Sequence, residues 1–126
     1  MTGYGRIAAL ALAAMIAMPG LSLAQDFRLL MIEQDGCYVC TQFNRDVAPA
    51  YAVSDEAAFA PLIHADLRGP LPEGVTLTSR PFVTPTFILL DARGHEVDRL
   101  NGFPGQEFFW PYLNEMFERA RQRVTG

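Results

Sequence analysis

Apolar residues recur along the chain with two different spacings. Short runs that are continuously apolar, or that alternate with polar residues, predict strands, and Thr86–Leu90 is the strongest of them. Apolar residues spaced three or four apart, such as Val39, Phe43 and Val47, predict amphipathic helices. These patterns predict strands over residues 27–33, 62–67, 86–90 and 96–100, and helices over residues 38–47, 54–61 and 106–121.

The order of the predicted elements indicates an α/β fold with one central sheet. A strand, a helix and a second strand joined by a right-handed crossover make a parallel pair. The turn at residues 91–94 joins the last two strands into an antiparallel hairpin. We therefore expect a central mixed sheet of about four strands, with flanking helices on both of its faces. Residues 68–81 are rich in glycine and proline and should form a loop.

Residues 1–24 have the composition of a signal peptide. One positive residue, Arg6, precedes an apolar run over residues 7–18, and a Pro-Gly break and small residues follow. This layout predicts export, cleavage after Ala24 and one domain over residues 25–126. The alternative is an uncleaved membrane anchor, but the apolar run is shorter than the roughly 20 residues that cross a bilayer as a helix.

Composition and charge narrow the range of functions. Half of the residues are hydrophobic, so the chain should fold, and removal of 24 of the 126 residues would leave 102, enough for one small domain. Removal of Arg6 leaves nine basic against fourteen acidic side chains, a net charge of −5. An acidic balance without a basic cluster argues against nucleic acid and against an anionic membrane surface as partners.

Both cysteines of the chain lie in GCYVC, residues 36–40, between the first predicted strand and the first predicted helix. A disulfide across so short a loop contributes little to stability, so a purely structural disulfide is the weaker alternative. A zinc site would need two further ligands, and only His64 and His95 could supply imidazole. A c-type haem would need histidine where Thr41 stands. The spacing favours a redox centre, with no metal or other cofactor.

The expected place at the start of a helix gives the two sulfurs different roles. Unpaired N–H groups and the helix dipole favour an anion there, and such helix starts lower the pKa of cysteine. We expect Cys37 to be accessible and to attack a disulfide of another molecule. Cys40, one turn further on, would then displace the product and close the Cys37–Cys40 disulfide.

The sequence resembles the thioredoxin superfamily. The resemblance rests on an apolar strand, on GCYVC opening a helix, and on VTPTFILLD at residues 83–91. It implies that Pro85 is a cis-proline beside the disulfide, and that Thr84 and Pro85, with Tyr38 and Phe103, bind the substrate segment. An ordinary trans-proline at a strand start is the alternative.

A narrower resemblance covers nearly all of residues 25–126. MIEQDGCYVC at residues 31–40 and NGFPGQEFFW at residues 101–110 resemble the SoxS-like periplasmic thioredoxin-like proteins of the bacterial sulfur-oxidation (Sox) system. The resemblance implies a periplasmic thiol–disulfide oxidoreductase that reduces a protein disulfide or mixed disulfide, and so reactivates a Sox carrier protein. Its electrons would come from a membrane thiol-reductant donor such as a DsbD/CcdA-type transporter. We expect a monomer.

The chain departs from thioredoxin proper in two places. Tyr38-Val39 replaces Gly-Pro between the cysteines, and Met31 stands where thioredoxin has a buried aspartate. Glu33, four residues before Cys37, is therefore the candidate proton relay for Cys40, with a solvated strand end as the alternative. Because no histidine or arginine lies between the cysteines, little beyond the helix start would stabilise the thiolate. This predicts a reductant or an enzyme of intermediate potential.

A second hypothesis comes from another class of protein. The chain would be a non-catalytic thioredoxin-like binding module, in which exposed Tyr38, Phe82 and Phe103 recognise a partner and the disulfide is structural. His64 and His95 are expected to be a strand residue and a solvated turn residue. The two hypotheses differ in whether function requires the cysteines.

Overall fold

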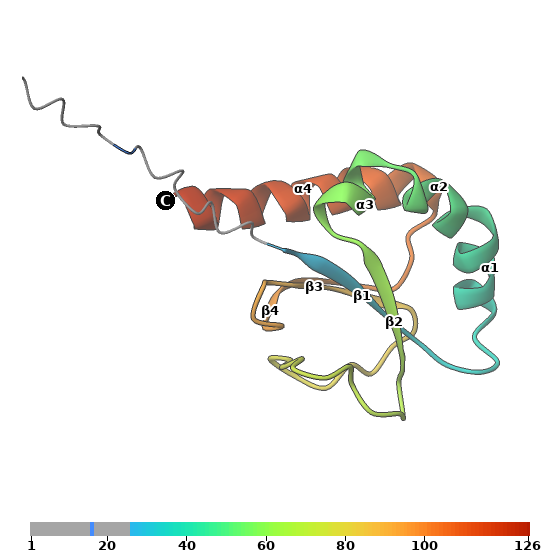
Figure 1. Cartoon of the computed structure of the whole chain (residues 1–126). Coiled ribbons are helices and arrows are strands. Elements are labelled where there is room, and N and C mark those ends of the chain that lie inside the picture. The colour runs from blue at the N-terminus through green and yellow to red at the C-terminus, as the bar shows by residue number, and fades with distance from the viewer. Residues whose placement is uncertain (1–15, 17–25) are drawn as a thin grey trace, which may run out of the picture.

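The strands and helices of the computed structural model come from residues 26–126; residue 16 is the one other residue that it describes. The signal-peptide prediction therefore lies outside the described residues. No helix within this part of the chain is long and apolar enough to cross a membrane. The elements, labelled in Figure 1, are β1 (Arg28–Glu33), α1 (Tyr38–Asp46), α2 (Ala48–Ala52), α3 (Asp55–Phe59), β2 (Leu62–Asp66), β3 (Thr86–Leu90), β4 (Glu96–Asn101) and α4 (Gln106–Thr125).

The strands form one mixed sheet in the order β2-β1-β3-β4. β1 pairs in parallel with β2, with Met31 opposite His64, and antiparallel with β3, with Met31 opposite Phe87. β3 and β4 form the predicted antiparallel hairpin. Every residue of β3 is buried, as expected for a continuous apolar run at the centre of a sheet. The prediction of a mixed four-stranded sheet with flanking helices is confirmed.

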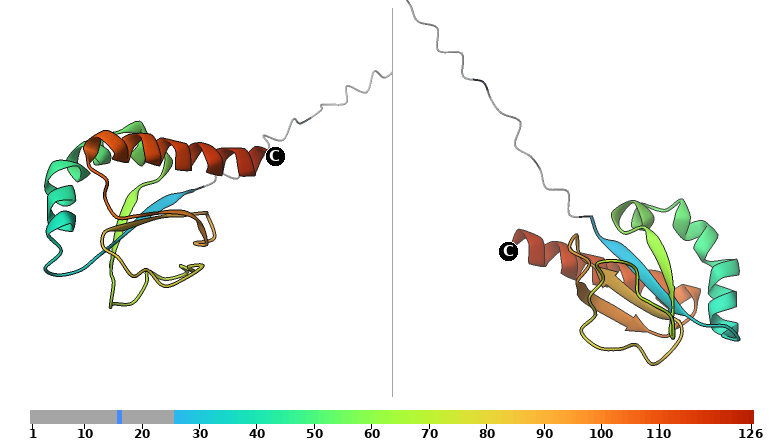
Figure 2. Two further views of the ribbon diagram at one scale, coloured as in Figure 1. Left: turned by 180° about the vertical axis from the view of Figure 1, so that it is seen from behind. Right: turned by 60° about the horizontal axis from the view of Figure 1, so that its bottom comes forward.

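The prediction that helices cover both faces of the sheet is wrong. All four helices of the described residues pack on one face, around Met31 and Phe87. Figures 1 and 2 show the helices on one side of the strands and the long loop between β2 and β3 on the other. The helices contribute Phe43, Tyr51, Phe109, Leu113 and Phe117 to this core, all fully buried.

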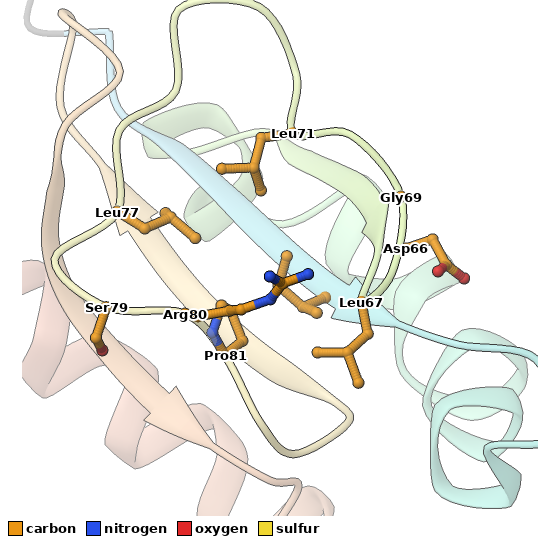
Figure 3. Close-up of a pocket in the computed structure, with 9 residues that line it drawn as sticks. Asp66, Leu67, Gly69, Leu71, Leu77, Ser79, Arg80 and Pro81 are labelled. Carbon is orange, nitrogen blue, oxygen red and sulfur yellow. The ribbon is translucent and has the colours of Figure 1, made fainter.

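The second face of the sheet is covered by loop 67–81 in place of a helix. Leu67, Val75 and Leu77 of this loop pack on the buried residues Leu30, Ile32, Ile88 and Leu90. The glycines and prolines in the loop prevent a helix there, but its few apolar side chains still exclude water from the sheet. A cavity of about 320 Å³ remains beneath the loop, and Figure 3 shows Leu71 and Arg80 pointing toward its centre.

The helices begin and end near the predicted residues, with one addition. α1 ends at Asp46, but the chain starts α2 directly, with Pro49 in its first turn, where a missing N–H costs little. The sequence patterns did not predict α2. Ser54 caps α3 as predicted: its Oγ accepts a hydrogen bond from the N–H of Ala57 at 3.2 Å.

Loop 67–81 is fastened to the β3–β4 hairpin by backbone and side-chain hydrogen bonds. The N–H of Thr76 donates to the carbonyl of Gly94 at 2.9 Å, and the N–H of Glu96 donates to the carbonyl of Thr76 at 3.0 Å. The Glu96 carboxylate accepts from the N–H of Thr78 at 2.8 Å and from Arg99 Nε at 2.6 Å. Burial alone would raise the pKa of Glu96, but the bonds from Arg99 and Thr78 hold that pKa below its usual value.

Replacing Glu96 by Gln should lower the free energy of unfolding at pH 7 by about 1–3 kcal/mol, because hydrogen bonds to a charged group are lost. The folded-state pKa of Glu96 is depressed, so its contribution is complete above the unfolded-state pKa and disappears as pH falls through the folded-state value. Urea unfolding should therefore show a deficit for Glu96→Gln at neutral pH that shrinks below about pH 4.

The control for this experiment is Glu115→Gln. Glu115 forms an exposed ion pair with Arg119 at 3.9 Å, and such pairs contribute about 0–1 kcal/mol. Its substitution should leave the unfolding curve nearly unchanged at every pH. A Glu96→Gln deficit of equal size at pH 7 and pH 3 would contradict the assigned role of the carboxylate.

Candidate active site

The two cysteines lie at the start of α1, at the end of the buried strand β1. The turn between β1 and α1 uses Gly36 in the left-handed region, with φ of 78°. In the same turn the N–H of Cys37 donates to the carbonyl of Gln34 at 3.3 Å. Cys37 is the N-cap of α1, and its Sγ accepts a hydrogen bond from the N–H of Cys40 at 3.1 Å. The predicted position of the motif at the helix start is confirmed.

Cys37 and Cys40 form a disulfide, with 5.2 Å between their Cα atoms. Cys40 is only 3% exposed and belongs to the core, whereas Cys37 is partly exposed and packs against the core's edge. A molecule that approaches from solvent therefore reaches the sulfur of Cys37 first. Cys37 is thus the more accessible cysteine and Cys40 the buried one, as expected from the sequence.

The electrostatics at the helix start favour an anionic sulfur once the disulfide is reduced. The first turn of α1 contains no acidic residue, and Arg45 is in its last turn. The N–H of Cys40, which already points at Cys37 Sγ, can donate to a thiolate at the same place. No side-chain cation lies between the cysteines, so backbone groups provide the main stabilisation.

A second loop, at the start of β3, is bonded to the turn that precedes Cys37. The Thr84–Pro85 peptide bond is cis, and Pro85 is buried. The N–H of Gly102 donates to the carbonyl of Pro85 at 2.8 Å, so the loop after β4 is attached at the same place. Gln34 Nε2 donates to Thr84 Oγ1 at 2.9 Å and joins this loop to the turn before Cys37. Gln34 lies in the MIEQDGCYVC segment that carries the narrower resemblance, but the sequence patterns predicted no role for it.

The three aromatic side chains predicted to meet a partner differ in their exposure. Tyr38 is 75% exposed and Phe82 is 78% exposed, as predicted for residues that meet a partner. Phe103 is not freely exposed, contrary to prediction. It is partly buried, and its ring packs edge-on against Phe43 with 5.4 Å between centroids. Phe103 therefore supports the wall of the site more than it projects from it.

Glu33 faces a polar cleft behind Cys40. Its Oε2 accepts a hydrogen bond from Asn44 Nδ2 at 2.9 Å, and its Oε1 lies 3.4 Å from His64 Nδ1. Cys40, Asn44 and His64 all line this cleft, which has a volume of about 410 Å³. His64 thus belongs to the site, although sequence reasoning treated it as an ordinary strand residue.

The register of the sheet explains this cluster. Met31 pairs with His64 and Glu33 with Asp66, so Glu33 and His64 are on the same face of neighbouring strands. Asn44 is one helical turn after Cys40 and meets them from α1. His95, in contrast, is exposed in the β3–β4 turn, where its N–H donates to Asp91 Oδ1 at 3.0 Å. Within residues 26–126 no three histidine, cysteine or carboxylate side chains are arranged so that they could hold a metal ion.

Comparison with known proteins gives one informative match. No protein-family model matches the chain, and no curated protein sequence matches it. Among solved structures, the chain is similar to the reduced form of the periplasmic thioredoxin SoxS from Paracoccus pantotrophus. The two share 42% sequence identity over 75% of this chain and 99% of that chain, with a TM-score of 0.72.

The Gln34–Thr84 hydrogen bond should be measurable by a double-mutant cycle. Gln34→Leu removes the donor and Thr84→Val the acceptor, and each should lower the free energy of unfolding of the oxidised protein by about 0.5–1.5 kcal/mol. The double variant should lose clearly less than the sum, because one bond is removed in both cases. Gln42→Leu, from a glutamine that does not bond Thr84, should instead add to Thr84→Val. If the losses of Gln34→Leu and Thr84→Val simply added in the double variant, the hydrogen bond between these two side chains would be refuted.

Proposed function

Since the chain belongs to the SoxS-like periplasmic thioredoxins, we propose that it is a periplasmic protein-disulfide reductase. Its CxxC disulfide and thioredoxin-like fold make it a thiol–disulfide oxidoreductase of that family. The observation that supports the proposal best is the asymmetry of the sulfurs. Cys37 is partly exposed at the helix start with an N–H directed at its Sγ, and Cys40 is buried.

The catalytic cycle follows from that asymmetry. In the reduced enzyme, the Cys37 thiolate attacks a substrate disulfide, a bond forms between Cys37 Sγ and one substrate sulfur, and the other substrate sulfur leaves as a thiolate. Cys40 then loses its proton and attacks Cys37 Sγ, which releases the second substrate thiolate. Two electrons pass to the substrate, whose sulfurs take up two protons, and the Cys37–Cys40 disulfide remains.

The substrate segment would lie across the loops beside the disulfide. Tyr38 offers an exposed ring next to Cys37, and the Thr84–Pro85 loop presents its backbone to an extended peptide. Phe103 supports this wall from behind, and the exposed Phe82 extends it. Extended peptide segments are commonly bound through hydrogen bonds to their backbone together with apolar contacts to their side chains.

The direction of electron flow is proposed from the sparse stabilisation of the thiolate. A strongly oxidising centre requires a strongly stabilised reduced form. Here backbone N–H groups contribute, but no cation lies between the cysteines. The enzyme would therefore donate electrons, received from a membrane thiol transporter of the DsbD/CcdA type. By similarity to SoxS, its substrate would be a cysteine-bearing Sox carrier protein that it returns to the reduced, active form.

A binding module with a structural disulfide is the competing function. The exposure of Tyr38 and Phe82 would serve a binding module equally well. Such a module would keep its partner when both cysteines are replaced by serine, because its contacts are aromatic. An enzyme with the same surface would lose all turnover.

The reductase should reduce insulin disulfides with dithiothreitol as electron source, and Cys37→Ser should abolish this activity. Cys40→Ser should instead accumulate a covalent adduct with an insulin chain, because the resolving sulfur is missing. Mass spectrometry before and after added dithiothreitol would identify the adduct. Adducts with both variants or with neither would contradict the assigned roles, and wild-type turnover no faster than dithiothreitol alone would favour the binding module.

The same Cys40→Ser variant tests the proposed partner. In a periplasmic extract of the source cell it should capture a Sox carrier protein through that protein's cysteine, whereas Cys37→Ser should capture nothing. Capture of a different protein would overturn the proposed partner but leave the reductase activity intact.

A further inference from the structure

The cleft behind Cys40 contains a set of polar groups that the cycle above does not use. Glu33 from β1, Asn44 from α1 and His64 from β2 meet there, with 2.9 Å between Asn44 Nδ2 and Glu33 Oε2 and 3.4 Å between His64 Nδ1 and Glu33 Oε1. The cycle requires a proton acceptor next to Cys40, because the thiol of this buried residue must lose a proton before its sulfur can attack.

Exposure increases along this set of residues from the core outward. Cys40 is 3% exposed, the Glu33 side chain 30% and the His64 side chain 42%. All three line one cleft, so a proton that leaves the sulfur can reach solvent through groups that both accept and donate it. Met31, at the position of thioredoxin's aspartate, cannot take part.

Asn44 positions the carboxylate of Glu33 within this cleft. Its amide nitrogen donates to Glu33, while no donor from the described residues reaches its buried Oδ1. A buried amide oxygen normally accepts a hydrogen bond, and here the donor can be water in the cleft or the thiol of Cys40. Asn44 is one turn after Cys40 on the same helix. It can therefore hold such a water, or the S–H of Cys40, next to the Glu33 carboxylate.

Among the described residues that line the cleft, His64 is the only one whose side chain can become positive. Glu33, Asp35 and Asp66 contribute carboxylates from β1, the following turn and β2. On its other side His64 lines a hollow with Tyr51 and Ser54 of the α2–α3 segment. Burial raises the pKa of Tyr51, so its phenol stays neutral and brings no competing charge at physiological pH.

We infer that Glu33 and His64 form a proton path for Cys40, with Asn44 as a positioning residue. This inference rests on the proposed function. When Cys40 attacks Cys37 Sγ, the Cys40–Cys37 bond forms, the Cys37–substrate bond breaks, and the electron pair leaves with the substrate sulfur. The Cys40 proton passes to the Glu33 carboxylate and then to His64 Nδ1, in the tautomer that carries hydrogen on Nε2. The exposed imidazolium releases a proton to solvent, which restores both groups.

The two steps can be timed separately with 5,5′-dithiobis(2-nitrobenzoate) and the reduced protein. The first coloured thiolate reports attack by Cys37 and depends on reagent concentration. The second reports resolution by Cys40 and does not. Glu33→Gln should slow resolution about 100-fold, at the lower end of the range of general acid–base effects. His64→Gln should slow it by a smaller factor, about 10-fold, because water can still accept the proton from Glu33, and both variants should change attack by less than about twofold.

Two further variants separate a proton path from a structural effect. Glu33→Gln/His64→Gln should be no slower than Glu33→Gln, because the residues act in series. Glu33→Asp keeps a carboxylate and should recover part of the rate. His95→Gln and Glu115→Gln, at residues that do not line the cleft, are matched controls and should leave the rate of resolution unchanged.

The possible outcomes are distinct. Unchanged resolution in Glu33→Gln and His64→Gln, or equal slowing of attack and resolution, would overturn the proton path and leave the reductase proposal standing. If the wild-type protein released only the first thiolate, Cys40 would not resolve the mixed disulfide, and the proposed function would fail together with this inference.

Discussion

The hydrogen bond from the N–H of Cys40 to Cys37 Sγ is the interaction on which the site depends. It exists because β1 ends one short turn before α1 begins, so that Cys37 is the N-cap and Cys40 closes the first turn. The same geometry leaves one sulfur partly exposed and the other buried. Position in the fold, more than the chemistry of neighbouring side chains, therefore assigns the two sulfurs their roles.

The rest of the fold keeps that helix start in place. Gln34 connects the turn before Cys37 to Thr84, and Gly102 connects the loop after β4 to Pro85, so three loops are joined next to the start of α1. The helices lie on one face of the sheet, and a loop fastened by Glu96 and Arg99 protects the other. The redox site is thus at one end of the central strands, where backbone groups from several loops converge.

Sequence patterns predicted the parts of the structure that depend on local periodicity. The strands, the CxxC motif at a helix start and the Ser54 cap follow from neighbouring residues. Features that depend on tertiary contacts were missed. A proline that ends one helix can begin the next. An apolar face of the sheet can be covered by a loop in place of a helix. Strand register, which sequence does not reveal, brings His64 to Glu33.

Cys37 is expected to be an activated sulfur that solvent can reach, and the direct test is its alkylation by iodoacetamide in the reduced protein. We expect Cys37 to react at least about ten times faster in the folded protein than in the same protein unfolded in urea at the same slightly acidic pH, because only the folded chain has the helix start. Cys37 that reacts at the same rate in both states, or more slowly when folded, would contradict the account.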